Sequence, residues 1–240
     1  MTPSVRLLCL DTSTQTARVA VVDGSGAPVA RAEATAERHS AHVLTLCDEV
    51  LRASGLRPAG LDGIACGAGP GSFTGLRVGL AVAKGLALAT GKPLLLVSSL
   101  QALATDIARA AAPAAPGFVV PCIDAGKGEV YAVACALDAA GVVAPGGEPW
   151  RLTPEALVAR LADVPEALVA GNGAERHAAV IGAGARHVPI AGPTALSIGA
   201  LALPRLARGE ADDLEKAVPF YGRPPDITAA KTGKKHLAND

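Results

Sequence analysis

The sequence predicts an α/β protein built from two similar halves, and three observations support this class. Short apolar runs that end in turn residues alternate with longer runs whose apolar residues recur at helical spacing. The order strand, turn, strand, helices and a strand opening into glycines occurs twice along the 240 residues. A stretch rich in Ala and Pro, residues 110–117, separates the two occurrences.

The composition limits the classes of function. The chain has 22 basic and 22 acidic residues and a formal net charge of +0, which argues against a protein that holds nucleic acid by its own charge. Half of the residues are hydrophobic but only 2% are aromatic. The core must therefore be filled by Ala, Val and Leu, and base-stacking platforms would be difficult to build. The five cysteines form no CxxC pair, so we expect buried, reduced thiols.

We expect no membrane span and a cytoplasmic location. No apolar run approaches the roughly 20 residues that cross a bilayer, and the best candidate, VGLAVAKGLALA, is interrupted by Lys84. The N-terminal sequence MTPSVRLLCLD leads directly into a predicted strand and lacks the regions of a secretory signal.

The first half begins with a predicted β-hairpin. The runs VRLLCL and RVAVV flank the polar turn DTSTQTA, which places Asp11 at the tip of the first strand. A further strand is expected over residues 29–34. Apolar residues at helical spacing then predict a helix that closes at Gly55.

The most distinctive segment follows this helix. LDGIACGAG predicts a buried strand running into glycines, and Ser72 or Thr74 is suited to cap the helix expected over roughly residues 75–90. The triplet GKP ends that helix, LLLVS is the next strand, and another helix begins near Ser98.

The second half repeats the pattern. FVVPCID predicts a strand and VYAVACAL its returning partner, so Asp124 stands where Asp11 stands in the first half. PTALSIGALALPRLARG predicts a last helix that tolerates Pro204 or breaks there, and VPFYGRPPD predicts an extended segment. The expected organisation is a first half over residues 1–108, a second half over 117–222 and a polar tail over 223–240.

The segment GPGSFTGLRVGLAVAKGLALA allows two interpretations. Gly69, Gly71 and Ser72 precede a helix start, where backbone N–H groups could converge on an anion, although neither the P-loop nor the dinucleotide pattern matches. The alternative is a small-residue helix face for close packing, which we favour because glycine within a helix costs stability that only close approach offsets. Its members are Gly75, Gly79, Ala81, Ala83, Gly85 and Ala87.

Two further clusters have polar side chains suited to ligands. Asp11, Thr12, Ser13 and Thr14 have oxygens that suit a hydrated magnesium ion and phosphates. The alternative, which we favour from spacing alone, is an ordinary capped turn. His39 and His42 lie three residues apart, a spacing that can face one metal. No third ligand converges on them, so we favour surface or capping histidines.

The order of the motifs resembles the TsaB (YeaZ) family. LLCLDTSTQTARVAVV, ERHSAHVL, GPGSFTGLRVGLAVAKGLALA, VSSLQALA, IDAGKGEVYAV and VPFYGR occur in the order seen in that family, between residues 5 and 223. The family is similar to the actin, sugar kinase and Hsp70 (ASKHA) superfamily. The resemblance therefore implies two duplicated ribonuclease-H-like, actin-like halves with mixed sheets and flanking helices, which agrees with the repeat.

The resemblance implies an accessory subunit with no catalytic residues of its own. Members of the family pair with their paralogue TsaD, which transfers the threonylcarbamoyl group from threonylcarbamoyl-AMP to N6 of the adenosine 3′ of the anticodon in tRNAs that read ANN codons. ATP, ADP and Mg or Zn belong to TsaD and to the ATPase TsaE, so we expect no tightly bound cofactor and no metal site here. Contact with tRNA is expected only through the complex, and a homodimer when the chain is isolated.

The resemblance also implies where the site residues lie. Two helices, residues 39–53 and 75–90, are expected to bind TsaD or a second copy of the chain. The expected interface residues are His39, His42, Val43, Leu46, Val50, Leu76, Gly79, Leu80, Ala83 and Ala87. The expected turn residues, or vestigial anion or nucleotide site, are Asp11, Thr12, Ser13, Gly69, Gly71, Ser72 and Asp124.

A function from a different class stays open. The chain could be a self-sufficient ASKHA-type small-molecule kinase or ATPase that uses Asp11 and Asp124. That hypothesis predicts tight binding of magnesium nucleotide by the isolated chain. A peptidase finds no Ser, Cys or metal constellation in the sequence.

Overall fold

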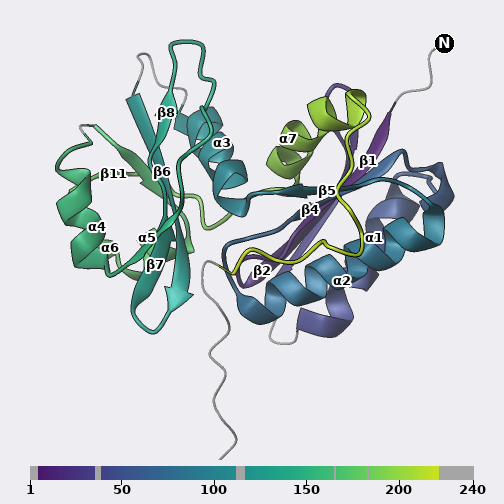
Figure 1. Ribbon diagram of the computed structural model, residues 1–240, viewed down its shortest axis with the longest axis horizontal. Helices are drawn as coiled ribbons and strands as arrows, with labels where there is room; N and C mark the ends of the chain where they lie inside the picture. The colour runs from purple at the N-terminus through teal and green to yellow at the C-terminus, as the bar shows by residue number, and fades with distance from the viewer. Residues whose placement is uncertain (1–4, 36–38, 112–116, 165, 183, 222–240) are drawn as a thin grey trace, which may run out of the picture.

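The computed structural model describes residues 5–35, 39–111, 117–164, 166–182 and 184–221, with only the backbone of residues 39–42. Within these ranges it confirms the α/β class: each of two halves contains a mixed sheet with helices on its faces (Figure 1).

The first strand of the chain lies at the centre of the first sheet. Among the described residues the strand order is β3-β2-β1-β4-β5, with β1, β2 and β3 antiparallel and β4 and β5 parallel to β1. The strands are β1 (Arg6–Asp11), β2 (Thr16–Asp23), β3 (Pro28–Thr35), β4 (Gly63–Gly67) and β5 (Leu94–Val97).

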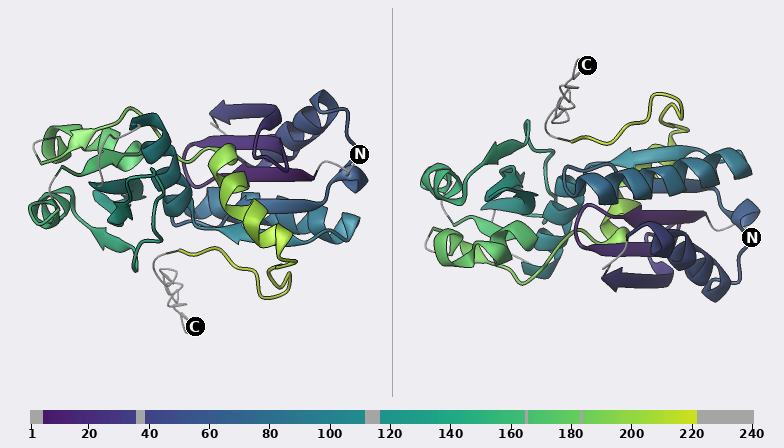
Figure 2. Two further views of the ribbon diagram at one scale, coloured as in Figure 1. Left: turned by 90° about the horizontal axis from the view of Figure 1, so that it is seen from above. Right: turned by 90° about the horizontal axis from the view of Figure 1, so that it is seen from below.

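Helices cover both faces of this sheet, which explains the nearly continuous apolar runs of its central strands. On one face α1 (His39–Ala53) and α2 (Phe73–Thr90) pack over Leu8 and Leu10. On the other face α7 (Ala195–Ala207) packs over Leu7 and Cys9 (Figure 2). A short 3-10 helix, η1 (Pro58–Gly60), precedes β4.

The second sheet repeats the first, strand for strand. Its order β9-β7-β6-β10-β11 matches β3-β2-β1-β4-β5, with the same parallel and antiparallel neighbours, so the duplication expected from the sequence is confirmed. β8 (Cys135–Leu137) pairs with β6 outside this repeat. The repeated strands are β6 (Gly117–Gly126), β7 (Glu129–Ala132), β9 (Trp150–Leu152), β10 (Leu168–Ala170) and β11 (Arg186–His187).

Helices also lie on both faces of the second sheet. Ile123 faces α3 (Ser99–Ala111), the helix that leads from the first half into the second. Cys122 faces the opposite side, where α4 (Pro154–Leu161), α5 (Asn172–Arg176) and α6 (Ala178–Ile181) pack.

The end of the chain departs from the expected division into halves. Ile198 and Ala202 of α7 are buried in one cluster with Leu7 and Cys9, so α7 belongs with the first sheet. The second half therefore does not extend over the whole of 117–222. The physical reason is that the face of the first sheet opposite α1 and α2 needs an apolar cover. The helix continues through Pro204 and ends at Ala207.

Residues 210–221, here called the C-terminal strap, return along the first half toward the second (Figure 1). The backbone N–H of Asp212 donates to the Leu94 carbonyl at 2.8 Å, and its carboxylate accepts from the Leu96 N–H at 2.7 Å. Farther on, the Phe220 N–H donates to the Ala68 carbonyl at 2.7 Å. The strap thereby satisfies backbone groups of the edge strand β5.

Helix α2 has the length and apolar composition that would allow it to cross a membrane. Its buried residues Leu80, Ala83 and Ala87, however, close the core of the first half against Leu10 and Ile64. We therefore describe α2 as a core helix of the fold.

Candidate functional site

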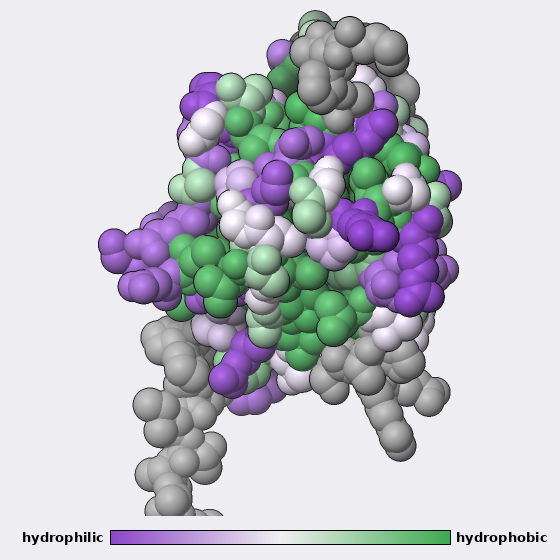
Figure 3. Space-filling model, turned by 90° about the vertical axis from the view of Figure 1, so that its right-hand side faces the viewer, coloured by the Kyte–Doolittle hydropathy of each residue, from purple (hydrophilic) through white to green (hydrophobic). Residues whose placement is uncertain are grey.

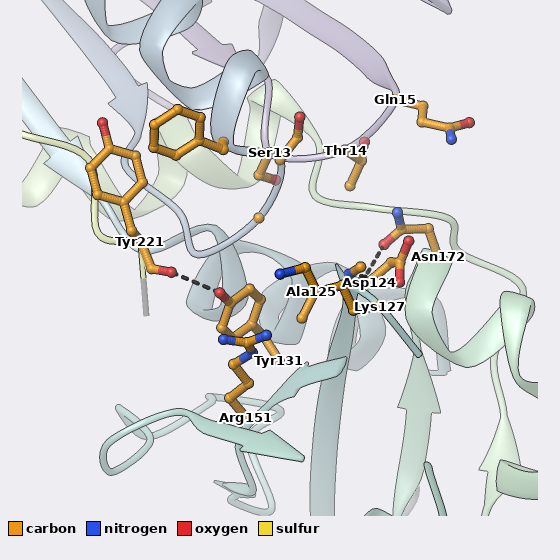
Figure 4. Close-up of a pocket in the computed structure, with 14 residues that line it drawn as sticks. Ser13, Thr14, Gln15, Asp124, Ala125, Lys127, Tyr131, Arg151, Asn172 and Tyr221 are labelled. Atoms are coloured by element: carbon orange, nitrogen blue, oxygen red, sulfur yellow. Dashed lines mark hydrogen bonds between the residues drawn. The ribbon is translucent and has the colours of Figure 1, made fainter. Parts of the chain in front are cut away.

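A cleft of about 570 Å³ opens between the two halves (Figure 4). The turn after β1 and the N-terminal end of α2 form one wall, the β6–β7 turn and β9 form the other, and the strap closes one end. The lining residues are Ser13, Thr14, Gln15, Gly71, Ser72, Phe73, Asp124, Ala125, Gly126, Lys127, Tyr131, Arg151, Asn172 and Tyr221.

Only part of the predicted anion or nucleotide site reaches this cleft. Ser13, Gly71, Ser72 and Asp124 line it. Asp11 does not, because it is 1% exposed and lies behind the turn. The remaining two predicted residues, Thr12 and Gly69, likewise do not belong to the lining.

The contacts of Asp11 explain its position. Its Oδ1 accepts hydrogen bonds from the Ser13 N–H at 2.9 Å and the Ser13 hydroxyl at 2.7 Å, and its Oδ2 accepts from the Ser99 hydroxyl at 2.7 Å. Burial raises the pKa of Asp11, although the hydrogen bonds from Ser13 and Ser99 oppose that shift. A Cβ atom at Gly67 would collide with the carboxylate, so β4 also closes it in. This arrangement does not fit a carboxylate that binds hydrated magnesium.

Asp124, the counterpart in the second half, is also engaged. Its Oδ2 accepts from Arg176 Nη1 at 2.8 Å, and its Oδ1 accepts from the Gly126 N–H at 3.1 Å. Its own N–H donates to Asn172 Oδ1 at 3.1 Å (Figure 4). These contacts are those of a turn residue with an ion pair, and they do not favour the kinase or ATPase alternative.

The histidine pair falls largely outside the described residues. His39 and His42 lie in the first turns of α1, and their side chains are not among those that the structure describes. Among the described residues, no group of three or more His, Cys, Asp or Glu side chains is placed to hold a metal ion.

Eight of the ten predicted interface residues are buried inside this chain and so do not form an exposed surface of it, and the side chains of the other two, His39 and His42, lie outside the described part of the structure. Six of the eight pack in the core cluster of the first sheet, because the apolar stripe of a helix covers its own core first. The eight buried residues are Val43, Leu46, Val50, Leu76, Gly79, Leu80, Ala83 and Ala87.

The glycines of α2 show what the small-residue face packs against. A Cβ atom at Gly79 would collide with the Thr12 side chain, and one at Gly75 would collide with the Thr12 carbonyl. The Thr12 hydroxyl donates to the Gly75 carbonyl at 2.8 Å. The favoured packing interpretation is thus correct in kind, but the neighbour is the β1 turn and not a helix of another chain.

The opposite side of α2, here called the outer face, is exposed. Leu88 is 77% exposed and Phe73 is 47% exposed. The exposed residues between them are Thr74, Arg77, Ala81 and Gly85. In the sequence, the residues of the outer face occupy the positions between the buried residues of α2.

Helix α1 adds apolar surface beside the outer face. Leu44 of α1 is 55% exposed and, with Leu51 and Leu86, lines a groove of about 440 Å³ between the two helices. Hydrophobic residues gather low on the end of the first half, the side on which α1 and α2 lie (Figure 3).

A second feature that sequence reasoning missed is the aromatic cluster at the end of the strap. The rings of Phe73 and Tyr221 lie 4.9 Å apart, and the Arg77 guanidinium lies 5.2 Å from the Phe73 ring centre. The Tyr131 hydroxyl donates to the Tyr221 carbonyl at 2.7 Å (Figure 4). The signal in the sequence is that few aromatic residues are present and that two of them stand in the VPFYGR segment.

The sequence of this chain is similar to those of proteins named for tRNA threonylcarbamoyladenosine synthesis. The family model of TsaD, tRNA N6-adenosine threonylcarbamoyltransferase, matches residues 31–142. The tRNA threonylcarbamoyladenosine biosynthesis protein TsaB of Escherichia coli (strain K12) is 35% identical over 127 residues, 53% of each chain. Its namesake from Haemophilus influenzae is 40% identical over 131 residues, 53% of this chain and 52% of its own. These alignments span about half the length of the curated relatives.

A solved structure extends the similarity over nearly the whole chain. YeaZ from Pseudomonas aeruginosa is 31% identical with a TM-score of 0.76, and the match covers 90% of this chain and 99% of that one. Because this match covers nearly all of both chains at 31% identity, the chain belongs to the TsaB/YeaZ family.

Proposed function

We propose that this chain is the non-catalytic partner subunit of a TsaD-type transferase in the synthesis of threonylcarbamoyladenosine in tRNA. In this proposal TsaD transfers the threonylcarbamoyl group from threonylcarbamoyl-AMP to N6 of the adenosine 3′ of the anticodon. The names of the relatives and the matching TsaD model support the assignment to this pathway.

The contacts of the two strand-tip carboxylates support a non-catalytic role. Asp11 is buried and accepts three hydrogen bonds from within the chain, and Asp124 is paired with Arg176. A carboxylate that binds magnesium and phosphate needs oxygen lone pairs open to the ligand. Asp11 is closed off from the cleft, and Asp124, which lines it, already accepts one bond within the chain on each oxygen.

The outer face of α2 is the single observation that best supports a partner role. Leu88 and Phe73 stand at its two ends, and Ala81 and Gly85 between them have small side chains that let a second helix approach closely. The adjoining groove below Leu44 would receive side chains of that helix. We propose that TsaD binds this face, and that a second copy of the chain binds it when TsaD is absent.

The other members of the complex follow from the same assignment. TsaE is proposed to join the pair of TsaD and this chain in the cytoplasm, and tRNA is proposed to reach this chain only through the complex. Nucleotide and metal would belong to TsaD and TsaE.

The test is a substitution that changes only the outer face. A Cβ atom at Gly85 meets none of the described residues within 4 Å, so Gly85→Arg adds a charged side chain outside the core. We expect Gly85→Arg to abolish the mixed complex with TsaD and the homodimer, as measured by light scattering after size exclusion. Burying an unpaired charge in a helix interface costs several kcal/mol, on the order of 3–5 kcal/mol.

Two controls make the result specific. Gly85→Ala keeps the small side chain and should bind normally. Val142→Arg introduces the same charge at an exposed position of the second half and should also bind normally. A Gly85→Arg protein that binds TsaD as well as the unaltered chain does would refute the assignment of the interface.

A further inference from the structure

We propose that two buried carboxylates, Asp11 and Asp106, lock helix α3 to the first half and so fix the angle between the two halves. This inference concerns the isolated chain and does not depend on the proposed function.

Helix α3 is the element on which the relative position of the halves depends. Its residues Leu100, Leu103 and Ile107 are buried in the same cluster as Val119 and Ile123, so it forms part of the second half's core. It also begins directly after β5 of the first half. Any contact that holds α3 to the first half therefore holds the second half as well.

The first lock lies at the N-terminal end of α3. Ser99 donates its hydroxyl to Asp11 Oδ2 at 2.7 Å across 88 residues of sequence. The same hydroxyl oxygen accepts from the Gly69 N–H at 3.1 Å, and the Ser99 N–H donates to the Gly69 carbonyl at 2.9 Å. Asp11, Ser99 and the loop after β4 thus form one buried network, with Ser99 0% exposed.

The second lock joins α3 to the other crossing between the halves. Asp106 accepts from the Thr194 N–H at 2.7 Å, the Thr194 hydroxyl at 2.8 Å and the Ser197 hydroxyl at 2.6 Å. Thr194 stands where the chain, coming from β11 of the second half, enters α7 of the first. Arg109 lies 3.8 Å from Asp106 and also donates to the Ser197 hydroxyl at 3.3 Å.

Helix capping alone does not account for Asp106. Helix α7 already has its own N-cap, because the Thr194 hydroxyl oxygen accepts from the Ser197 N–H. Asp106 adds bonds from a different helix to that cap while being only 6% exposed. A buried carboxylate is stable only when its hydrogen bonds are kept, so rotation of the halves that breaks them is opposed.

A third contact acts at the other end of the cleft. The strap is held to the first half by Asp212 and Phe220, and its Tyr221 carbonyl accepts from Tyr131 of the second half at 2.7 Å. Rotation about α3 would therefore stretch a contact on the strap side as well.

The test measures the distance between the halves by double electron–electron resonance. Spin labels are attached at Arg31→Cys on β3 and Asp163→Cys after α4, both exposed positions. Burial raises the pKa of each of the five native thiols, so only the introduced cysteines are labelled. We expect one narrow distance that magnesium ATP does not shift.

The test variant carries both Asp11→Asn and Asp106→Asn in the spin-labelled chain. Each amide has an oxygen that accepts but a nitrogen that does not, so each lock loses an acceptor. We expect the distance distribution to become roughly twofold broader or more as the halves populate other angles. Asp138→Asn is the matched control, because Asp138 also accepts backbone N–H groups, but within one exposed turn. It should leave the distribution unchanged.

Hydrogen exchange on the unaltered chain keeps the proposal testable if the variants fail to fold. The amides of Gly69 and Thr194 should exchange no faster than the core strands do, because they open only with the whole molecule. Exchange at those amides about tenfold faster or more than in the core would refute the proposal. Such exchange would mean that these hydrogen bonds break in local openings and do not restrain the angle between the halves. A broad distance distribution in the unaltered chain, or a shift with magnesium ATP, would refute it equally.

Discussion

Gly79 and Gly85 lie on one helix but have opposite surroundings. A Cβ atom at Gly79 would collide with the Thr12 side chain, whereas one at Gly85 would meet no atom within 4 Å in the part of the chain that the structure describes. The first glycine is required by a close approach, and the second is a helix residue open to solvent or to a partner.

The two Gly→Ala substitutions should therefore shift stability in opposite directions. Gly79→Ala should lower the free energy of unfolding by about 1–3 kcal/mol, because Thr12 must move. Gly85→Ala should raise it by roughly 0.5–1 kcal/mol, because alanine loses less backbone entropy in a helix. Urea unfolding of both variants checks this, and a shift of the same sign in both would show that the surroundings of the two glycines are alike.

Asp106 should give a pH dependence of known sign. Burial raises its pKa in the folded state above the unfolded value, although its hydrogen bonds and Arg109 oppose this. The folded state then binds the proton more tightly, so its contribution to stability is greatest below the unfolded pKa of about 3.9 and is lost as the pH rises through the folded pKa.

This contribution can be isolated by comparison with Asp106→Asn, which does not titrate at that position. The stability of the unaltered chain relative to the variant should fall as the pH rises, as measured by urea unfolding at several pH values above the acid limit of folding. A difference that grows with pH would mean that the hydrogen bonds outweigh burial and hold the folded pKa below its ordinary value.

At the residue scale, the sequence predicted that α2 packs closely against a neighbour, but it did not predict that this neighbour is Thr12 of the same chain. Of the predicted small-residue face of α2, positions 75, 79, 83 and 87 are buried and positions 81 and 85 are exposed. Helical periodicity shows that a stripe exists but not what it faces, and in this fold a core helix uses its most apolar stripe on its own sheet. The exposed residues that remain for a partner, such as Ala81 and Leu88, are the ones between those positions.

At the scale of elements, the C-terminal strap protects the edge of the first sheet. Asp212 accepts from the Leu96 N–H at 2.7 Å and from Arg205 Nη2 at 3.1 Å, and Arg205 Nη1 donates to the Leu96 carbonyl at 2.7 Å. These side chains occupy backbone groups of β5 that would otherwise be open to another strand.

Asp212→Ala should consequently destabilise the chain by about 1–3 kcal/mol, because it leaves the Leu96 N–H without its acceptor and Arg205 without one of its carboxylates. The neighbouring Asp213→Ala is the control: Asp213 pairs with Lys216 at the surface and should cost less, about 1 kcal/mol at most. Equal losses in urea unfolding would show that the Leu96 contact contributes little.

The elements show which parts of a fold a sequence determines locally. The hairpin β1–β2, the strand β4 and helix α2 were each predicted close to their observed bounds, because apolar periodicity and turn residues act over a few positions. The side of the molecule on which α7 lies was predicted wrongly. Its apolar pattern is the same whichever sheet it covers, and the bonds of Thr194 and Ser197 to Asp106 depend on residues 88 and 91 positions away.

At the scale of the whole molecule, the duplicated strand order places Asp11 and Asp124 at equivalent tips facing the space between the halves. In the first half the tip carboxylate is turned inward to Ser99, and in the second it is paired with Arg176. The repeat could be predicted from the sequence, whereas these different uses of the two carboxylates could not, since each depends on a partner from a distant segment.

The molecule thus combines two strand-tip carboxylates that are engaged within the chain, one buried and one lining the cleft, with an exposed helix face. The measurement that tests this account most directly is the modification of tRNA by purified proteins. Threonylcarbamoylated adenosine is quantified by mass spectrometry after incubation of tRNA and threonylcarbamoyl-AMP with TsaD alone, with this chain alone, and with both.

The account predicts product only when both proteins are present, and loss of most of that product when Gly85→Arg replaces the unaltered chain while Gly85→Ala supports full activity. Product formed by this chain alone would contradict the account and would return Asp11 and Asp124 to the centre of a catalytic mechanism. Full activity of TsaD without this chain would contradict it equally.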